Sequence, residues 1–217
     1  MASSRRQLLL LTIPYSHFAE KARWALAYYG VPHRERVLMP GFHISVVKGY
    51  LQYMSPEDVR ARAPGQAETE IPILVIHASD GVTVEKIIQG SQKILKYLSS
   101  QYATSEKPDL YESCGIDQAK AVSDLERSFD DTFGIAVRDW AYYDVLIANK
   151  WRSIIPWVLL GPKNPVGWRQ SVFWVFVSPL LGKTIIQYIN LTPERGKKAL
   201  EECRASFREA SRCESHV

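Results

Sequence analysis

Ser16 lies where an apolar segment meets an amphipathic one, within TIPYSHFAEKARWALAYYG at residues 12–30. A serine here can cap a helix, and the amides and partial positive charge of a helix N-terminus can stabilise an anion such as a thiolate. Lys21 and Arg23 add positive charge nearby. Because His17 need not face the hydroxyl, no general base can be assigned to Ser16. The sequence therefore favours hydrogen-bond donation to a bound anion over nucleophilic serine catalysis.

Two further segments could hold a small anionic peptide. The strand-like run IPILVI at 71–76 begins with a proline, which removes a hydrogen-bond donor from a sheet. If the Ile71–Pro72 bond is cis, the backbone of Ile71 can offer its N–H and C=O to an extended peptide. Ser91, in QGSQKI, can cap a predicted helix and give a second anion site. A thiolate at Ser16, a peptide backbone at Ile71 and a carboxylate at Ser91 would suit one such ligand.

The elements that must position these groups follow from the spacing of apolar residues. QLLLLTI predicts a buried strand, and helical spacing from Phe18 to Tyr29 predicts a helix that ends at Gly30. The dipeptide DG at 80–81 favours a turn between two antiparallel strands. We therefore expect a small α/β domain with a mixed four-stranded sheet and helices on both faces. The expected elements are strands at 7–13, 34–39, 71–76 and 82–89, a short helix near 44–53, and helices after Ser16 and from Ser91.

The remainder of the chain has the pattern of an all-α domain. The polar stretch ATSEKPDLYES predicts a linker, and no convincing strand follows it. A helical pattern covers 117–148, and Thr192-Pro193-Glu194 has the residue types of a helix start, for a helix that runs to about residue 212. The expected boundaries are an α/β domain at 5–102, a linker at 103–116 and a helical domain at 117–217.

Composition indicates a globular protein with an uneven charge. The 217 residues are 46% hydrophobic and 23% charged, which suffices for one large or two small domains. Residues 150–217 carry 11 Lys or Arg and 5 Asp or Glu. A solvated helical face explains this excess better than a nucleic-acid or membrane surface. The apolar stretch 172–189 is interrupted at Pro179, Gly182 and Lys183, which favours buried helices and leaves membrane association as an alternative.

Cysteine usage indicates a reducing compartment. Cys114, Cys203 and Cys213 are too few for a disulfide framework and form neither a Cys-x-x-Cys motif nor a metal-ligand pattern. The apolar run LLLLTI is too short for a secretory signal and ends at Pro14. We therefore expect a cytoplasmic protein without a metal site.

Two segments of the chain carry a family resemblance. YSHFAEKARWAL resembles the first helix of soluble glutathione transferases, and IPILV…DG…IIQGSQKILKYL resembles the rest of their thioredoxin-like half, so that the match covers 7–100. Ser16 is in the position of the catalytic residue of the serine-type and cysteine-type classes, tau and omega among them. The resemblance implies that Ser16 stabilises the glutathione thiolate, which attacks an apolar electrophile held by the helical half. Tyr15 is a second candidate, since other classes use a tyrosine hydroxyl.

The resemblance also assigns the residues that bind glutathione. It places the family's cis-proline at Pro72, after Ile71, and the acid–serine pair that holds the γ-glutamyl end at Gly90 and Ser91. Gly90 departs from the family, which has Glu or Asp there, so one glutamyl contact is lost. A homodimer is implied only by analogy with the family.

Other departures shape the functional expectation. No cysteine precedes Cys114, which argues against glutaredoxin-like reductase chemistry. The segment VRDWAYYDVL resembles the helical half of a bacterial-type branch, but nothing after Phe207 resembles the end of that half, so we expect a truncated helical domain. A non-catalytic binding or interaction protein of the same fold is the alternative to an enzyme.

Overall fold

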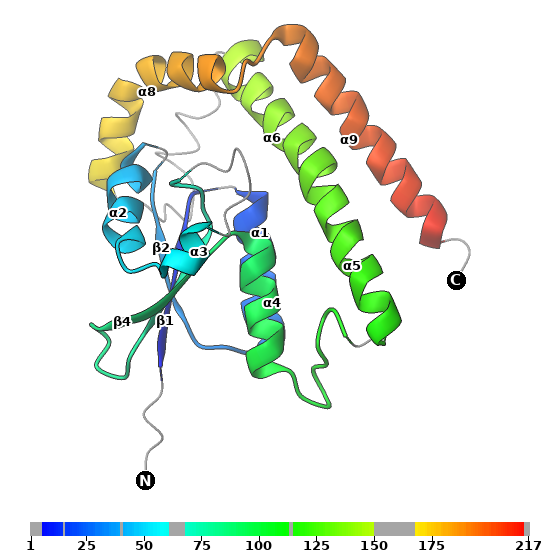
Figure 1. Cartoon of the computed structure of the whole chain (residues 1–217). Coiled ribbons are helices and arrows are strands. Elements are labelled where there is room, and N and C mark those ends of the chain that lie inside the picture. Colours follow the sequence, from blue (N-terminus) through cyan, green and yellow to red (C-terminus); the bar gives the residue numbers. More distant parts are fainter. Residues whose placement is uncertain are drawn as a thin grey trace. The chain divides into compact units, whose positions relative to one another are not determined.

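Two units make up the structure, a computed structural model that describes residues 6–14, 16–39, 41–60, 68–112, 115–149 and 168–214. The first unit covers Met1–Val122 and the second Ser123–Val217 (Figure 1). Each unit is described by itself below. The domain and linker boundaries expected from the sequence stay predictions.

The first unit contains the mixed four-stranded sheet that the sequence predicts. Its strands are β1 (Gln7–Thr12), β2 (Arg34–Val37), β3 (Ile73–His77) and β4 (Val84–Gln89), in the order β2-β1-β3-β4. β1 pairs with β2 in parallel and with β3 antiparallel, and β3 pairs with β4 antiparallel. The parallel pair requires the crossover helix that follows Ser16.

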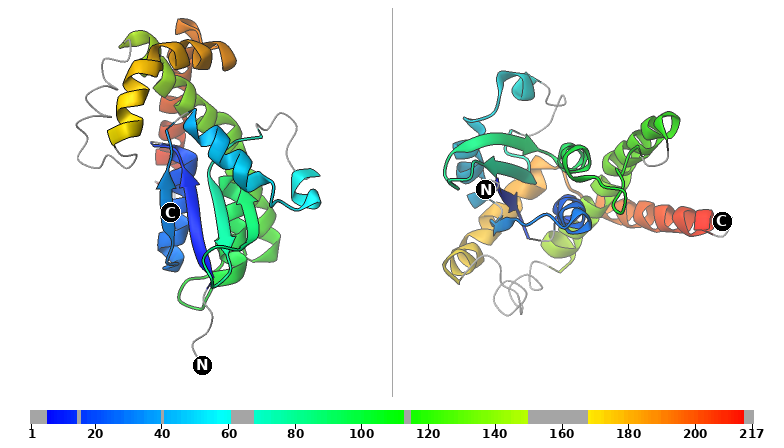
Figure 2. Two further views of the ribbon diagram at one scale, coloured as in Figure 1. Left: turned by 90° about the vertical axis from the view of Figure 1, so that its left-hand side faces the viewer. Right: turned by 90° about the horizontal axis from the view of Figure 1, so that it is seen from below.

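Helices cover both faces of this sheet, as expected (Figure 2). On one face α1 (His17–Tyr29) and α4 (Ser91–Tyr102) bury Leu26 and Ile94 against Leu10 and Leu74 of the strands. On the other face α2 (Phe42–Leu51) buries Val47. A short helix, α3 (Pro56–Arg60), lies in a segment that the sequence analysis treats as a loop.

The described part of the second unit is helical. The predicted helix at 117–148 is one continuous helical run, but two π-helical stretches interrupt its α-helical hydrogen bonding. The run comprises α5 (Ile116–Phe129), which begins in the first unit, η1 (Asp130–Gly134), α6 (Ile135–Tyr142) and η2 (Tyr143–Ala148). α8 (Trp168–Tyr188) and α9 (Pro193–Glu214) follow. α9 starts where the sequence predicts, with Thr192 Oγ1 accepting from the Arg195 N–H at 3.2 Å.

α9 packs along α6 through a small apolar cluster. Ala199 and Cys203 contact Ala136, and the rings of Phe133 and Phe207 meet edge to face with centroids 5.4 Å apart. Burial raises the pKa of the Cys203 thiol. This cysteine therefore has the surroundings of a packing residue.

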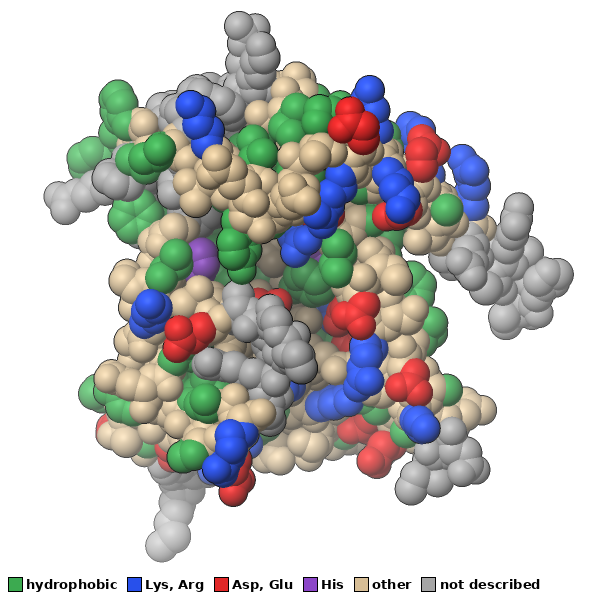
Figure 3. Space-filling model, turned by 45° about the horizontal axis from the view of Figure 1, so that its top comes forward, with side chains coloured by type: hydrophobic (Ala, Val, Ile, Leu, Met, Phe, Trp, Pro, Cys, Tyr) green, Lys and Arg blue, Asp and Glu red, His purple; other side chains and the backbone are tan. Residues whose placement is uncertain are grey.

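Charged side chains of both signs are interspersed on the face that Figure 3 shows. On α9, Lys198 lies 3.4 Å from Glu202 and Arg204 lies 2.7 Å from Glu201. Two of the basic side chains of the last third are therefore paired with acidic side chains of the same helix. In the part of the chain that the structure describes, no helix is both long enough and apolar enough to cross a membrane.

Candidate functional site

The sheet register brings the predicted site segments to one end of the sheet. β1 runs toward Ser16, and its residue Leu11 is paired with Ile73, the first residue of β3. Ile73 is also paired with Gln89, the last residue of β4. The end of β1, the start of β3 and the end of β4 therefore share one edge. The N-termini of α1 and α4 follow directly from that edge.

Ser16 caps α1, as the sequence predicts. Its backbone is extended, with φ −76° and ψ 113°, and its Oγ accepts from the Ala19 N–H at 3.3 Å. A serine hydroxyl has one hydrogen to donate besides the lone pairs that accept. The cap therefore occupies an acceptor position of Ser16 and leaves its hydrogen available to an anion at the positive end of the helix.

The Ile71–Pro72 peptide bond is cis, as anticipated. Both residues precede β3, so Ile71 lies outside the ladder that joins β3 to its neighbours. The carbonyl of Pro72 accepts from the Gly90 N–H at 3.0 Å. This bond ties the segment before β3 to the start of α4, and it brings the four residues assigned from the family resemblance together. These residues are Ile71, Pro72, Gly90 and Ser91.

The expectation that Ser91 caps its helix is wrong. Gly90 occupies the N-cap position and makes no side-chain cap bond, while Ser91 is the first residue of α4 and is only 5% exposed. Gly90 has φ 96° and ψ 140°, a conformation that side-chain-bearing residues rarely adopt. The backbone thus gives a physical reason for glycine where the family has an acid.

An ion-pair network joins α1 to β2. Arg23 contacts Glu20 and also Glu35, whose Oε1 lies 2.5 Å from Arg23 Nη2. The buried Thr12 donates to the same Glu35 oxygen at 2.6 Å. Burial opposes the ionisation of Glu35, but the hydrogen bonds and charge of its partners outweigh it and lower its pKa. Arg23 therefore serves mainly as an inter-element ion-pair residue rather than as an uncompensated charge near Ser16.

Gln89 lies beside the segment that precedes β3, and the sequence analysis missed it. It is the last residue of β4 and only 3% exposed. Its Nε2 donates to the carbonyls of Glu68 at 2.9 Å and Glu70 at 2.8 Å. The signal that could have found it is a lone polar side chain at the inward end of an apolar strand, beside Ile87 and Ile88.

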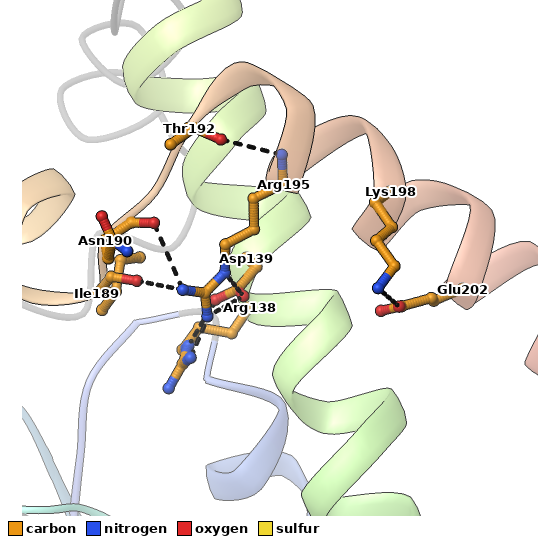
Figure 4. A network of polar contacts seen from close by, with 8 residues as sticks. All are labelled: Arg138, Asp139, Ile189, Asn190, Thr192, Arg195, Lys198 and Glu202. Atoms are coloured by element: carbon orange, nitrogen blue, oxygen red, sulfur yellow. Dashed lines mark hydrogen bonds and ion pairs between the residues drawn. The ribbon is translucent and has the colours of Figure 1, made fainter.

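The second unit holds a different polar cluster, around Asp139 of α6 (Figure 4). Asp139 is 3% exposed; its Oδ1 accepts from Arg138 Nε and Nη2 at 3.1 and 2.9 Å, and its Oδ2 accepts from Arg195 Nε at 2.8 Å. Arg195 also donates to the Ile189 carbonyl at 2.6 Å. Both carboxylate oxygens are engaged, so this cluster joins α6 to α9 rather than offering groups to a ligand.

Some expected residues lie outside what the structure describes. They are Tyr15 and Cys114. Among the described residues, no group of three or more His, Cys, Asp or Glu side chains could hold a metal ion.

Comparison with known proteins gives one family match, for residues 15–101, to the N-terminal domain of glutathione S-transferase. No curated protein matches the chain. Among solved structures, a glutathione S-transferase of Ceriporiopsis subvermispora in complex with glutathione is similar with a TM-score of 0.51 and 20% identity, over 94% of this chain and 71% of that one. At this identity the likeness shows the fold, and it confirms a thioredoxin-like domain followed by a helical region.

Two further structures are less similar. Prostaglandin synthase D of Nilaparvata lugens has a TM-score of 0.40 and 14% identity, over 93% of this chain and 97% of that one. Glutathione transferase Omega 2S of Trametes versicolor, in complex with 2,4-dihydroxybenzophenone, has a TM-score of 0.34 and 12% identity, over 92% of this chain and 89% of that one. Scores this low carry no argument about the present chain.

Proposed function

Because residues 15–101 of the chain match the N-terminal domain of glutathione S-transferase, we propose that the chain binds glutathione and conjugates its thiolate to apolar electrophiles. The observation that carries the proposal is the geometry of Ser16. It caps α1 with its oxygen and keeps a hydrogen to donate at the positive end of that helix.

In this proposal Ser16 lowers the pKa of the glutathione thiol. The hydroxyl donates to the sulfur, and the helix N-terminus favours the charged thiolate over the neutral thiol. A larger thiolate fraction at neutral pH means a faster attack on the electrophile, because the thiolate is the nucleophile. Ser16 acts as a hydrogen-bond donor throughout and forms no covalent bond.

The other assigned residues bind the peptide. The backbone of Ile71, before Pro72, pairs with the cysteinyl residue of glutathione. The N-terminus of α4, with Ser91 as its first residue, binds the γ-glutamyl carboxylate by donating hydrogen bonds to it. Gly90 offers no carboxylate to the γ-glutamyl ammonium group, so we expect weaker recognition at that end than in relatives with an acid there.

The finer parts of the proposal come from the family. A homodimer, a cytoplasmic location and a role in detoxification are proposed by analogy with glutathione transferases. The helical half would hold the apolar electrophile. No metal takes part in the proposed reaction.

The test is to titrate glutathione into the purified full chain by calorimetry and to measure its conjugation to chlorodinitrobenzene. Ser16→Ala should bind glutathione with similar affinity but turn over about a hundredfold more slowly, the typical cost of one lost donor to a developing or stabilised anion. Ultraviolet absorbance of the thiolate against pH should show a raised thiol pKa in that variant. Ser100→Ala, at the exposed far end of α4, is the matched control. Unchanged turnover in Ser16→Ala would remove the proposed role of Ser16.

Gly90 favours a second candidate, a non-catalytic protein of the same fold. Its φ of 96° makes a simple return to the family's acid costly, so the lost contact is built into the backbone. A folded wild-type chain that neither binds glutathione nor melts at a higher temperature in its presence would favour this candidate.

A further inference from the structure

Gln89 lies where β4 would have to continue in order to pair with the segment before β3. β4 ends at this residue, and the chain then turns into α4. The segment before β3 runs from Glu68 to Pro72, and β4 does not extend far enough to pair with its first residues. Backbone carbonyls that lack a partner and are withdrawn from water carry a free-energy cost.

The Gln89 side chain supplies the missing donors. Its two Nε2 hydrogens reach the carbonyls of Glu68 and Glu70, and the next residue, Gly90, donates its backbone N–H to the carbonyl of Pro72 at 3.0 Å. Three alternate carbonyls of one segment are thus held from the end of β4. These bonds also fix the amide orientation, because only the nitrogen can donate to two carbonyls.

The burial of Gln89 indicates that its hydrogen bonds, and not its size, are what matters at this position. Gln89 is 3% exposed, and its Oε1 is buried without a hydrogen-bond partner among the described residues. A buried polar atom without a partner opposes folding, so a side chain used only to fill space here would be better apolar. The two donated bonds are what the amide contributes at this position.

We propose that Gln89 is a positioning residue for glutathione recognition: it holds the Glu68–Glu70 backbone so that Ile71 presents its peptide groups to the cysteinyl part of the ligand. This proposal rests on the proposed function. Gln89 itself does not touch glutathione or the reacting atoms. Its loss should therefore weaken glutathione binding and leave the chemical step unchanged.

The main test compares Gln89→Met with wild type in steady-state conjugation of glutathione to chlorodinitrobenzene. Methionine keeps the length and the burial but cannot donate. We expect KM for glutathione to rise about tenfold, because the loss of the two hydrogen bonds from Gln89 loosens the Glu68–Glu70 backbone. The value of kcat should stay within about twofold, and KM for the electrophile should be unchanged. Gln101→Met, at an exposed position of α4, is the matched control. Wild-type KM in a folded Gln89→Met variant would overturn the proposal.

Gln89→Glu gives a second, independent signature. Its ionised carboxylate has no hydrogen to donate, whereas its protonated form has one, and burial raises the pKa of such a carboxyl group. The ratio of its KM to that of wild type should therefore fall as the pH is lowered. A ratio that does not change with pH, or failure of both Gln89 variants to fold, would overturn a positioning role.

Hydrogen–deuterium exchange of the ligand-free chain separates this proposal from the proposed function. Amides of residues 68–71 should exchange faster in Gln89→Met than in wild type or Gln101→Met. If the wild-type chain does not bind glutathione, the proposed function fails and the role of Gln89 in recognition fails with it, even where exchange is faster. If wild type binds glutathione but exchange and KM are unaltered in the variant, only the inference about Gln89 fails.

Discussion

Asp139 in α6 of the second unit and Ser16 at the N-cap of α1 in the first unit are both polar residues, but their hydrogen bonds are used differently. Both oxygens of Asp139 are engaged by the guanidinium groups of Arg138 and Arg195. Ser16 uses its oxygen for the cap and keeps a hydrogen. A cluster whose groups are all paired stabilises the fold, whereas one with a donor in reserve at a helix N-terminus can bind an anion.

The comparison extends to what surrounds each residue. Asp139 is a buried charge whose partners come from two helices, so removing the carboxylate leaves two guanidinium groups without their acceptor. At the end of the sheet, Gln89 and Gly90 hold backbone carbonyls, and no buried charge is involved. Changes in the second unit should therefore alter stability most, and changes at the sheet end should alter binding most.

The largest predicted effect is that of Asp139→Ala. The free energy of unfolding should fall by about 3 kcal/mol, the lower part of the range for breaking a buried pair, because Arg138 and Arg195 are each more than a third exposed. Urea unfolding followed by tryptophan fluorescence measures this, since five of the six tryptophans lie in residues 123–217. Asp131→Asn, at an exposed position of η1, is the control. If Asp139→Ala is no less stable than this control, the cluster is not what joins α6 to α9.

A close contact between helices gives the next largest effect. A Cβ at Gly196 would overlap Cγ of Tyr143, so Gly196→Ala should lower the free energy of unfolding by about 2 kcal/mol through overpacking. Gly49→Ala is the matched control, because nothing lies within 4 Å of the added Cβ in α2. It should raise stability by up to about 1 kcal/mol through helix propensity.

The partner of Gly196 can be tested in the same series. Adding Tyr143→Ala to Gly196→Ala should recover part of the loss, because the two changes are coupled through one contact. Strictly additive effects would show that α9 does not approach η2 as closely as the structure places it.

What could be predicted from the sequence depends on whether a feature is set by neighbours in the chain or by distant residues. The four strands and the helices that carry the site follow from the pattern of apolar residues, which is a continuous run in QLLLLTI and IPILVI and has helical spacing from Phe18 to Tyr29. Ser16 could be recognised as a cap because a cap depends only on neighbours in the chain. α3 was missed although its signal is local: Ser55 accepts from the Asp58 N–H at 3.0 Å and donates to the Asp58 carboxylate.

Residues whose role depends on distant partners could not be predicted. The partner Arg195 lies 56 residues from Asp139, and nothing in the sequence distinguishes that aspartate from exposed ones. Gln89 likewise bonds to residues 19 and 21 positions earlier. Ser91 was misassigned as a cap because a serine after glycine satisfies the local pattern, whereas the positive φ of Gly90 makes the glycine the cap residue.

The smallest effect on stability is expected at Glu35 of the first unit, and it depends on pH. Its pKa is lowered below the ordinary value of 4.5 by bonds from Arg23 and Thr12 that outweigh burial. The contribution of Glu35 to stability is therefore full above that value and is lost as the pH falls through the lowered pKa. Glu35→Gln should cost about 1 kcal/mol at neutral pH, the upper end for an ion pair that is partly exposed.

The pH dependence distinguishes this pair from the rest of the fold. The stability difference between wild type and Glu35→Gln, measured by urea unfolding at a series of pH values, should shrink toward zero in acid. Glu112→Gln, at an exposed position, should show little difference at any pH. A Glu35→Gln loss that persists unchanged in acid would mean that shape rather than charge joins α1 to β2. The first unit would then depend on packing where the second depends on a buried ion pair.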